Sequence, residues 1–76
     1  MDTEKAITMI IEEFARATNT NGSFNSAHEG FAVLLEEVDE LKNEVWKKAE
    51  KRDIEKLRKE ACQVAAMGFR FMVDCT

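Results

Sequence analysis

Four glutamates in the middle of the chain have the type and spacing needed to hold a metal ion. Glu36, Glu37, Glu40 and Glu44 would stand on one helix, and at about 100° per residue the last three fall within about 60° of one another. Like charges at such intervals destabilise a helix unless a cation lies between them. Only Glu44 has a basic residue four positions later, Lys48. Because hard divalent ions such as Mg²⁺ prefer oxygen ligands, this stretch is a candidate metal site.

A further acid has a matching position nearer the C-terminus. This acid is Glu60. If its helix packs antiparallel to the helix that carries Glu37 and Glu40, the three carboxylates converge beside the core, where they need a counterion. The alternative is a solvated acidic face whose glutamates pair with lysines. The same angular count places five residues on one flank of the later helix: Lys56, Glu60, Gln63, Met67 and Arg70.

Three helices are needed to position these residues. The first is predicted over 3–18, beginning after Asp2 or Thr3, and the polar cluster that follows it predicts a loop over 19–25. A second helix is predicted over 26–49, where Ser26 and Glu29 have the spacing of a capping box with reciprocal bonds to each other's N–H. A third is predicted over 53–74. Because the basic connection between them is short, the last two helices form a long antiparallel hairpin.

Apolar residues mark the face that each helix turns to the core. On the third helix Ala66, Phe69 and Cys62 lie away from the main stripe, which predicts an additional partner helix. The stripe of the second helix comprises Phe31, Leu34, Leu35, Val38, Leu41 and Val45. The stripe of the third comprises Ile54, Leu57, Ala61, Val64, Ala65, Gly68, Phe71 and Met72.

The composition indicates a single all-α domain over 1–76. Its 76 residues are 45% hydrophobic and 34% charged, with three glycines and no proline, which disfavours a fold of many short strands. A helical core of this size is thin. We therefore expect a homo-oligomer, either a homodimer or a homotetramer, in which hairpins from different copies complete a four-helix bundle.

Charge and hydropathy exclude two classes of partner. The net charge of −4 argues against a nucleic acid polymer, and the apolar stretch 61–69 is too short to span a membrane. Acid and base are segregated: residues 29–46 hold six acids and one base, a net −5, whereas residues 47–59 hold seven bases and three acids, a net +4. Two cysteines and no signal peptide favour reduced thiols and a cytoplasmic protein, bacterial or, if phage-encoded, in the host cytoplasm.

The acidic helix resembles a known enzyme family. The run 34–41, Leu-Leu-Glu-Glu-Val-Asp-Glu-Leu, contains Glu-Glu-x-x-Glu and is followed by a basic spacer and Glu60. This pattern looks like the MazG-like superfamily of all-α nucleoside triphosphate pyrophosphohydrolases, over Phe24 to Asp74, and the phrase 25–30 is similar to small phage and bacterial members. The resemblance implies Mg²⁺-dependent cleavage of a (deoxy)nucleoside triphosphate to the monophosphate and pyrophosphate in nucleotide-pool housecleaning, with Mn²⁺ as a substitute ion.

The family's metal ligands map onto three glutamates and one exception. The resemblance implies Glu37, Glu40 and Glu60 as ligands, but the fourth position, an aspartate in the family, is Gln63. Glutamine can still offer a carbonyl oxygen, although the site loses one charge. Four interpretations are open: Gln63 is a modified ligand, it holds a water bound to the ion, Glu36 or Glu44 substitutes for it, or the enzyme is weak.

Hydrolysis of a triphosphate needs a base and cations but no Ser or Cys nucleophile. Glu36 or Glu37 could orient the attacking water as general base. Lys56, Lys59 and Arg70 lie on or beside the acidic flank and could hold phosphate; ordinary solvation is an equal alternative for Lys59, whereas phosphate binding is favoured for Lys56 and Arg70. His28 and Asn25 lie two or more turns before the run of glutamates and could meet the base or sugar, but a surface or capping role is more common for a lone histidine near a helix start.

Two other functions compete with the enzyme. The domain could be a non-catalytic oligomerisation or adaptor module, or a degenerate MazG homologue, in which the acids are only a solvated face. A di-iron carboxylate bundle needs Glu-x-x-His pairs, and the sequence has none. The feature that distinguishes the enzyme from a solvated acidic face is the convergence of acids from two helices.

Overall fold

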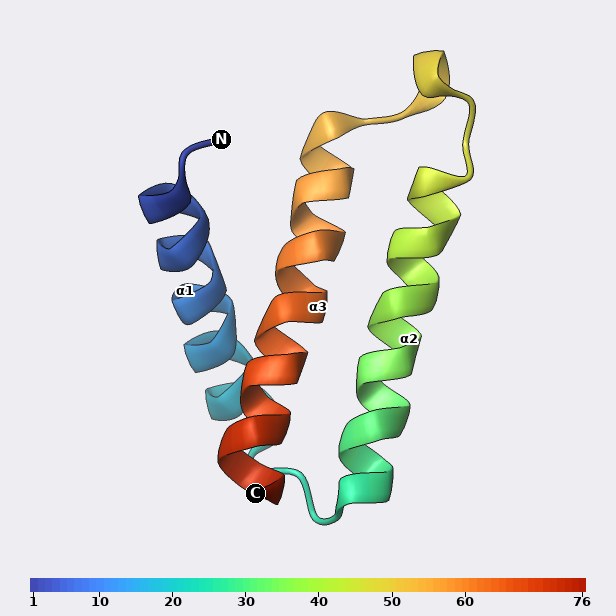
Figure 1. The fold of residues 1–76 in the computed structure, drawn as a ribbon. Helices are drawn as coiled ribbons and strands as arrows, with labels where there is room; N and C mark the ends of the chain where they lie inside the picture. The colour runs from blue at the N-terminus through green and yellow to red at the C-terminus, as the bar shows by residue number, and fades with distance from the viewer.

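Three long helices account for most of the chain in the computed structural model, which describes residues 1–76. α1 spans Thr3–Asn21, α2 spans Ala27–Val45 and α3 spans Ile54–Cys75, with one 3₁₀ turn, η1, at Ala49–Lys51. No strand is present, so the predicted all-α class is confirmed. None of these helices has both the length and the apolar character required to cross a bilayer. As Figure 1 shows, α2 and α3 form the predicted antiparallel hairpin, and α1 packs against α3.

α1 begins at the expected cap and ends three residues later than expected. The Asp2 carboxylate accepts a hydrogen bond from the Lys5 N–H at 2.8 Å, which satisfies one of the free donors of the first turn. At the other end Gly22 has a φ of 72°, and its N–H donates to the Thr18 carbonyl at 2.9 Å. Glycine adopts this positive φ without strain, so the helix includes Asn21 and the connection covers 22–26 rather than 19–25.

The start of α2 contains half of the predicted capping box. The Ser26 hydroxyl accepts from the Glu29 N–H at 3.1 Å, as expected. The Glu29 carboxylate, however, accepts from the backbone N–H and the side-chain amide of Asn25, both at 3.1 Å, instead of from the Ser26 N–H. The backbone of Ser26 itself is extended, with a φ of −159° and a ψ of 162°. The reciprocal bond to Ser26 is therefore a wrong prediction, and Asn25 is held at the helix start.

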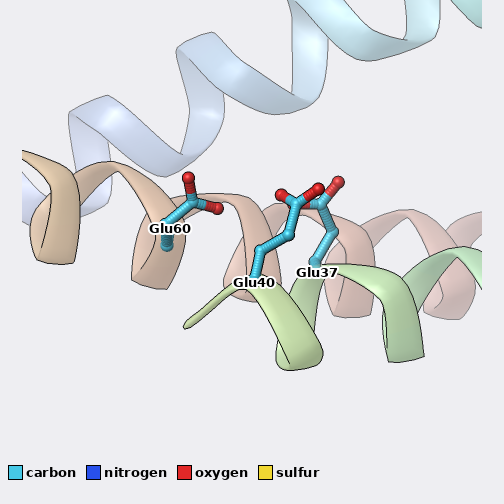
Figure 2. A group of neighbouring side chains, drawn as sticks. All are labelled: Glu37, Glu40 and Glu60. Atoms are coloured by element: carbon cyan, nitrogen blue, oxygen red, sulfur yellow. The ribbon is translucent and has the colours of Figure 1, made fainter. Parts of the chain in front are cut away.

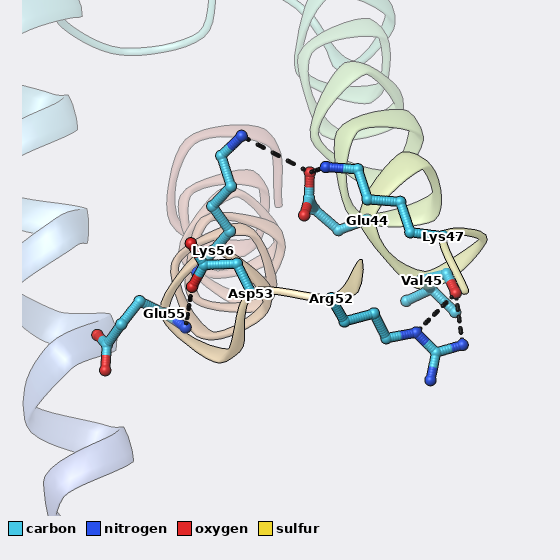
Figure 3. A network of polar contacts seen from close by, with 7 residues as sticks. All are labelled: Glu44, Val45, Lys47, Arg52, Asp53, Glu55 and Lys56. Atoms are coloured by element: carbon cyan, nitrogen blue, oxygen red, sulfur yellow. Dashed lines mark hydrogen bonds and ion pairs between the residues drawn. The ribbon is translucent and has the colours of Figure 1, made fainter. Parts of the chain in front are cut away.

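α2 ends at Val45, before the end of the predicted helix 26–49. The guanidinium of Arg52 donates to the Val45 carbonyl through Nε at 3.0 Å and Nη2 at 2.6 Å, as Figure 3 shows. This contact satisfies a carbonyl left free by the helix end. After η1, Asp53 caps α3 by accepting from the Glu55 N–H at 2.9 Å, so α3 begins one residue after the start of the predicted helix 53–74.

The core lies where α1, α3 and the 22–26 connection meet. Ala17, Phe24, Ala66 and Met67 are its buried hydrophobic residues. Only 7 of 76 residues are buried, and no large side chain is fully enclosed. The isolated chain therefore removes little apolar surface from water, which agrees with the thin core expected from its length.

Gly30 lets α2 approach α3 closely near the start of the hairpin. A Cβ atom at this position would lie 2.9 Å from Cδ2 of Phe71 and 3.0 Å from Cδ2 of Phe24. Both distances are shorter than ordinary carbon contacts. The absence of a side chain at Gly30 thus fixes how the two helices meet at this end.

α2 is rotated relative to its predicted apolar stripe. Leu34 and Leu41 are half-buried as expected, but Phe31 and Val38 are 59% and 40% exposed. Leu35 and Val45, from the same stripe, are also exposed, whereas Glu44 is only 7% exposed. The prediction that the whole stripe faces the core is wrong, because the acidic flank turns toward α3 in place of half of it.

The second apolar face of α3 has a partner within the chain. Ala66 is completely buried, and the Phe69 ring packs against the Phe14 ring of α1, with centroids 4.6 Å apart and planes at 62°. This edge-to-face arrangement is favourable for aromatic pairs. The partner helix expected for this face is thus α1 of the same chain, and this face gives no support to the expected homo-oligomer.

Candidate metal centre

Glu37 and Glu40 of α2 converge with Glu60 of α3, as the sequence predicts. One carboxylate oxygen from each lies within 4.8 Å of the others. Figure 2 shows the three side chains directed to the same side, on which α1 passes. Glu37 and Glu40 share one flank of α2 because residues three apart lie on the same face of a helix, and the packing of α2 against α3 brings Glu60 to that flank. The chain therefore contains an acidic cluster built from two helices.

Burial and mutual repulsion make Glu37 a weaker acid than usual. Partial burial is the largest cause, followed by the charge of Glu40 and a hydrogen bond shared with it, and together with Glu60 and Glu13 they raise the pKa of Glu37 to about 7. The pKa of Glu60 is also raised, first by burial and then by its hydrogen bond with Glu40, while Lys59 opposes the change. Carboxyl groups held this close together ionise with difficulty because their negative charges repel. A cation bound among them would remove that repulsion.

The Gln63 amide lies between the carboxylates of the two helices. With its nitrogen turned toward them, Nε2 donates to Oε2 of Glu37 at 3.0 Å and to Oε2 of Glu60 at 3.1 Å. The amide thus partly offsets the repulsion between these two acids. Rotation of the same group would present its oxygen instead. Three carboxylates and one amide are oxygen donors of the kind that Mg²⁺ and Mn²⁺ bind, so the donor set fits a hard divalent ion.

Glu44 extends the acidic row away from this cluster. Its Oε2 accepts from Lys47 Nζ at 2.8 Å and lies 3.8 Å from Lys56 Nζ, whereas its Oε1 is buried without a hydrogen-bond partner. Figure 3 shows both lysines directed to the same carboxylate oxygen. The expected pairing with Lys48 does not form because α2 ends before that residue.

The two lysines predicted to hold phosphate lie in different surroundings. Lys56 is exposed and directed toward Glu44. Lys59 is exposed, forms no ion pair, and lies close enough to Glu60 to lower the pKa of that carboxyl group. Of the two, Lys59 is the lysine whose charge acts on the acidic cluster.

Arg70 is committed to the connection between α1 and α2. The residue is 3% exposed, its Nη2 donates to the Gly22 carbonyl at 2.7 Å, and its guanidinium lies 4.1 Å from the centroid of the Phe24 ring. It stands two helical turns beyond Gln63, a rise of about 10 Å. The predicted flank is correct, but the side chain anchors a loop instead of facing the carboxylates.

The remaining predicted residues lie outside the cluster. Glu36 precedes Glu37 and is exposed. His28 is exposed in the first turn of α2 and Asn25 is held by Glu29. Between His28 and Glu37 the helix rises by about 14 Å, so these two candidates stand at the far end of the hairpin.

Two residues of α1 approach the site without having been predicted. The charge of Glu13 raises the pKa of Glu37, and the charge of Glu37 helps to raise the pKa of Arg16, whose principal cause is its hydrogen bond to Glu13. Glu13 and Arg16 also form an ion pair with each other. Their spacing of three residues is the only sequence signal, and it does not reveal which face of α1 meets α3.

Comparison of the chain with protein-family models, with curated proteins and with solved structures gives no match. The resemblance to the MazG-like superfamily therefore depends on the Glu-Glu-x-x-Glu motif and on Glu60. The structure adds that this small three-helix protein brings those acids together.

Proposed function

We propose that the protein is a divalent-metal-dependent nucleoside triphosphate pyrophosphohydrolase of the MazG-like type, acting on free nucleotides in the cytoplasm. The observation that carries the proposal is the convergence of Glu37, Glu40 and Glu60 from two helices, with ligand oxygens within 4.8 Å. Carboxylate clusters of this kind suit Mg²⁺, which binds together with substrate phosphates. The products would be a nucleoside monophosphate and pyrophosphate.

In this proposal the acidic cluster would both hold the ion and activate the attacking water. Glu37, Glu40 and Glu60, with the Gln63 carbonyl as fourth donor, would hold the ion, which supplies neutralisation of phosphate charge and acidification of water. Glu37, or the adjacent Glu36, would take the proton of the attacking water. Lys59 would face the phosphates.

A second copy of the chain completes the fold in this proposal. The outer side of α2 exposes Phe31, Leu35, Val38 and Val45, and α1 covers α3 instead of this side. A continuous apolar stripe on a helix is typical of packing against another helix. We propose a homodimer or homotetramer in which this stripe is buried, to be checked by light scattering; a monomer at all concentrations would contradict it.

The test is hydrolysis of a panel of nucleoside triphosphates with Mg²⁺ or Mn²⁺, with pyrophosphate measured separately from phosphate. Glu37→Gln and Glu40→Gln should abolish pyrophosphate release. Asp39→Asn, which neutralises an exposed acid between them, should keep it. Unchanged release in the first two variants would refute the proposed site. No release from any nucleotide would favour an adaptor module or a degenerate enzyme.

A further inference from the structure

Two grooves adjoin each other along the seam between α1 and α3. The first has a volume of about 470 Å³ and is lined almost entirely by apolar side chains, among them Met9, Ile10, Leu57 and Ala61. It lies between the N-terminal parts of both helices. A groove of this size and character suits the flat apolar faces of a small aromatic ring system.

The second groove is charged and continues from the first toward the carboxylates. Its volume is about 490 Å³, and its charged lining is mixed: three basic residues, Arg16, Arg58 and Lys59, and three acidic ones, Glu12, Glu13 and Glu55. Met9, Arg58 and Cys62 line both grooves. Gln63 lines the second groove only and reaches the acidic cluster through its amide. The order along the surface is therefore apolar groove, charged groove, carboxylates.

Two basic side chains of the charged groove, Arg58 and Lys59, can accept an anion although glutamates share the lining. Arg58 Nη1 lies 3.2 Å from Oε1 of Glu55, whose side chain is 81% exposed. An exposed ion pair of this kind contributes little to stability, so Arg58 can exchange Glu55 for a phosphate group. Lys59, which has no ion pair, stands beside it on α3. Arginine and lysine are the side chains that proteins commonly use to bind phosphate.

We propose that the seam between α1 and α3 is the nucleoside triphosphate site, with the base in the apolar groove and the phosphates passing Arg58 and Lys59 toward Glu37, Glu40 and Glu60. This inference rests on the proposed function. A nucleoside triphosphate fits because it has an aromatic base at one end and a chain of negative charge at the other. Along the seam the apolar groove, the charged groove and the carboxylates follow one another in the order in which the base, the phosphates and their metal ion would lie.

Weak selection among bases follows from the lining of the apolar groove. Of its lining residues only Arg58 and Cys62 offer side-chain polar groups. Strong discrimination between bases requires buried hydrogen-bonding groups that an incorrect base leaves unpaired, whereas apolar contacts discriminate by about 10- to 200-fold. We therefore expect purine and pyrimidine nucleotides to bind with affinities within about 200-fold of one another.

The test fills the apolar groove and compares two ligands that share phosphates but differ in the base. Ala6 lines the groove from α1, and Ala15 is exposed on the same helix outside both grooves. Ala6→Leu and Ala15→Leu are therefore a matched pair with the same helix propensity change. The probes are α,β-imido nucleoside triphosphates, which resist hydrolysis at the bond concerned, and inorganic tripolyphosphate, both titrated with Mg²⁺ present.

Ala6→Leu should weaken nucleotide binding by about tenfold or more and leave tripolyphosphate binding unchanged, whereas Ala15→Leu should change neither. Unchanged nucleotide affinity in Ala6→Leu, while tripolyphosphate still binds, would overturn this inference alone. A change of oligomeric state in Ala6→Leu without a change in nucleotide affinity would also overturn it, because the groove would then be occupied by a second copy of the chain. Wild-type protein that binds neither probe would overturn the proposed function as well. Should Ala6→Leu fail to fold, Ala61→Leu fills the same groove from α3.

Discussion

Replacing Glu37 by glutamine should make the metal-free protein more stable at alkaline pH. In the folded protein the pKa of Glu37 is about 7, compared with 4.5 for an unperturbed carboxyl group. When the folded pKa of an acid is raised, its ionised form disfavours the fold. The resulting loss of stability is absent well below pH 4.5, accumulates as the pH rises from 4.5 to the folded pKa of about 7, and is complete above about pH 8.

The size of the effect follows from that difference in pKa. Each pH unit corresponds to about 1.4 kcal/mol, which gives about 3.4 kcal/mol if the full difference is expressed. Glu37 is only partly buried, and solvent screens its neighbours, so we expect about 1 kcal/mol. For a domain of this size, 1 kcal/mol changes Tm by about 4–8 °C.

The assay is thermal unfolding followed by circular dichroism, at about pH 5 and about pH 8, with EDTA and with millimolar Mg²⁺. Glu37→Gln should melt above wild type at the higher pH in EDTA and should converge with it at the lower pH. Mg²⁺ should raise the Tm of wild type, because a ligand stabilises the state that binds it, and should have less effect on the variant. Asp39→Asn, an exposed acid on the same helix, is the control and should follow wild type.

The reasoning is refuted if Glu37→Gln is less stable than wild type at about pH 8 in EDTA. In that case Glu37 would stabilise the fold in its ionised form, as an acid with a lowered pKa does. An equal response of both proteins to Mg²⁺ would refute its role as a metal ligand.

Three further predictions concern packing, the fourth ligand and the buried arginine. Gly30→Ala should lower the free energy of unfolding by about 1–3 kcal/mol, because its methyl group would meet two phenylalanine rings. Gly68→Ala, where a Cβ meets nothing within 4 Å, should raise the free energy of unfolding by about 0.5–1 kcal/mol. If urea denaturation ranks the two variants in the reverse order, the packing described at Gly30 is wrong. Gln63→Glu should reduce stability in EDTA and bind Mg²⁺ more tightly in a calorimetric titration, and an unchanged affinity would show that this side chain does not reach the ion. Arg70→Ala should cost about 2 kcal/mol and leave the affinity of the folded protein for tripolyphosphate unchanged; a stable variant that no longer binds tripolyphosphate would restore Arg70 to the phosphate site.

The helices and the acidic cluster could be predicted because their determinants are local. Asp2, Ser26 and Asp53 cap the helices as their residue types indicate. The angular spacing of Glu37 and Glu40 places them on one flank whatever the helix packs against. A short connection then leaves few ways to bring Glu60 near them.

The rotation of α2 and the position of Arg70 could not be predicted because both depend on distant contacts. The apolar residues of α2 form a wide arc, and which half of it faces α3 depends on the close approach at Gly30. Arg70 shares a flank with Gln63, but its guanidinium follows the carbonyl of Gly22, 48 residues away in the sequence. The boundary of α1 was misplaced for a simpler reason, since the residue that ends the helix is Gly22 and not the polar residues before it.

The attachment of α1 to a single neighbour bears on how quickly a ligand can exchange. Only Ala17, near the C-terminal end of α1, is buried, while Ile7 and Ile11 in its first half are more than half exposed. Amide protons in that half should therefore exchange with solvent through local fraying, and those near Ala17 only when larger parts of the protein open. A helix that detaches from one end while anchored at the other can uncover the seam and cover it again. The free energy of this partial opening, rather than that of global unfolding, would then set the residence time of whatever lies beneath α1.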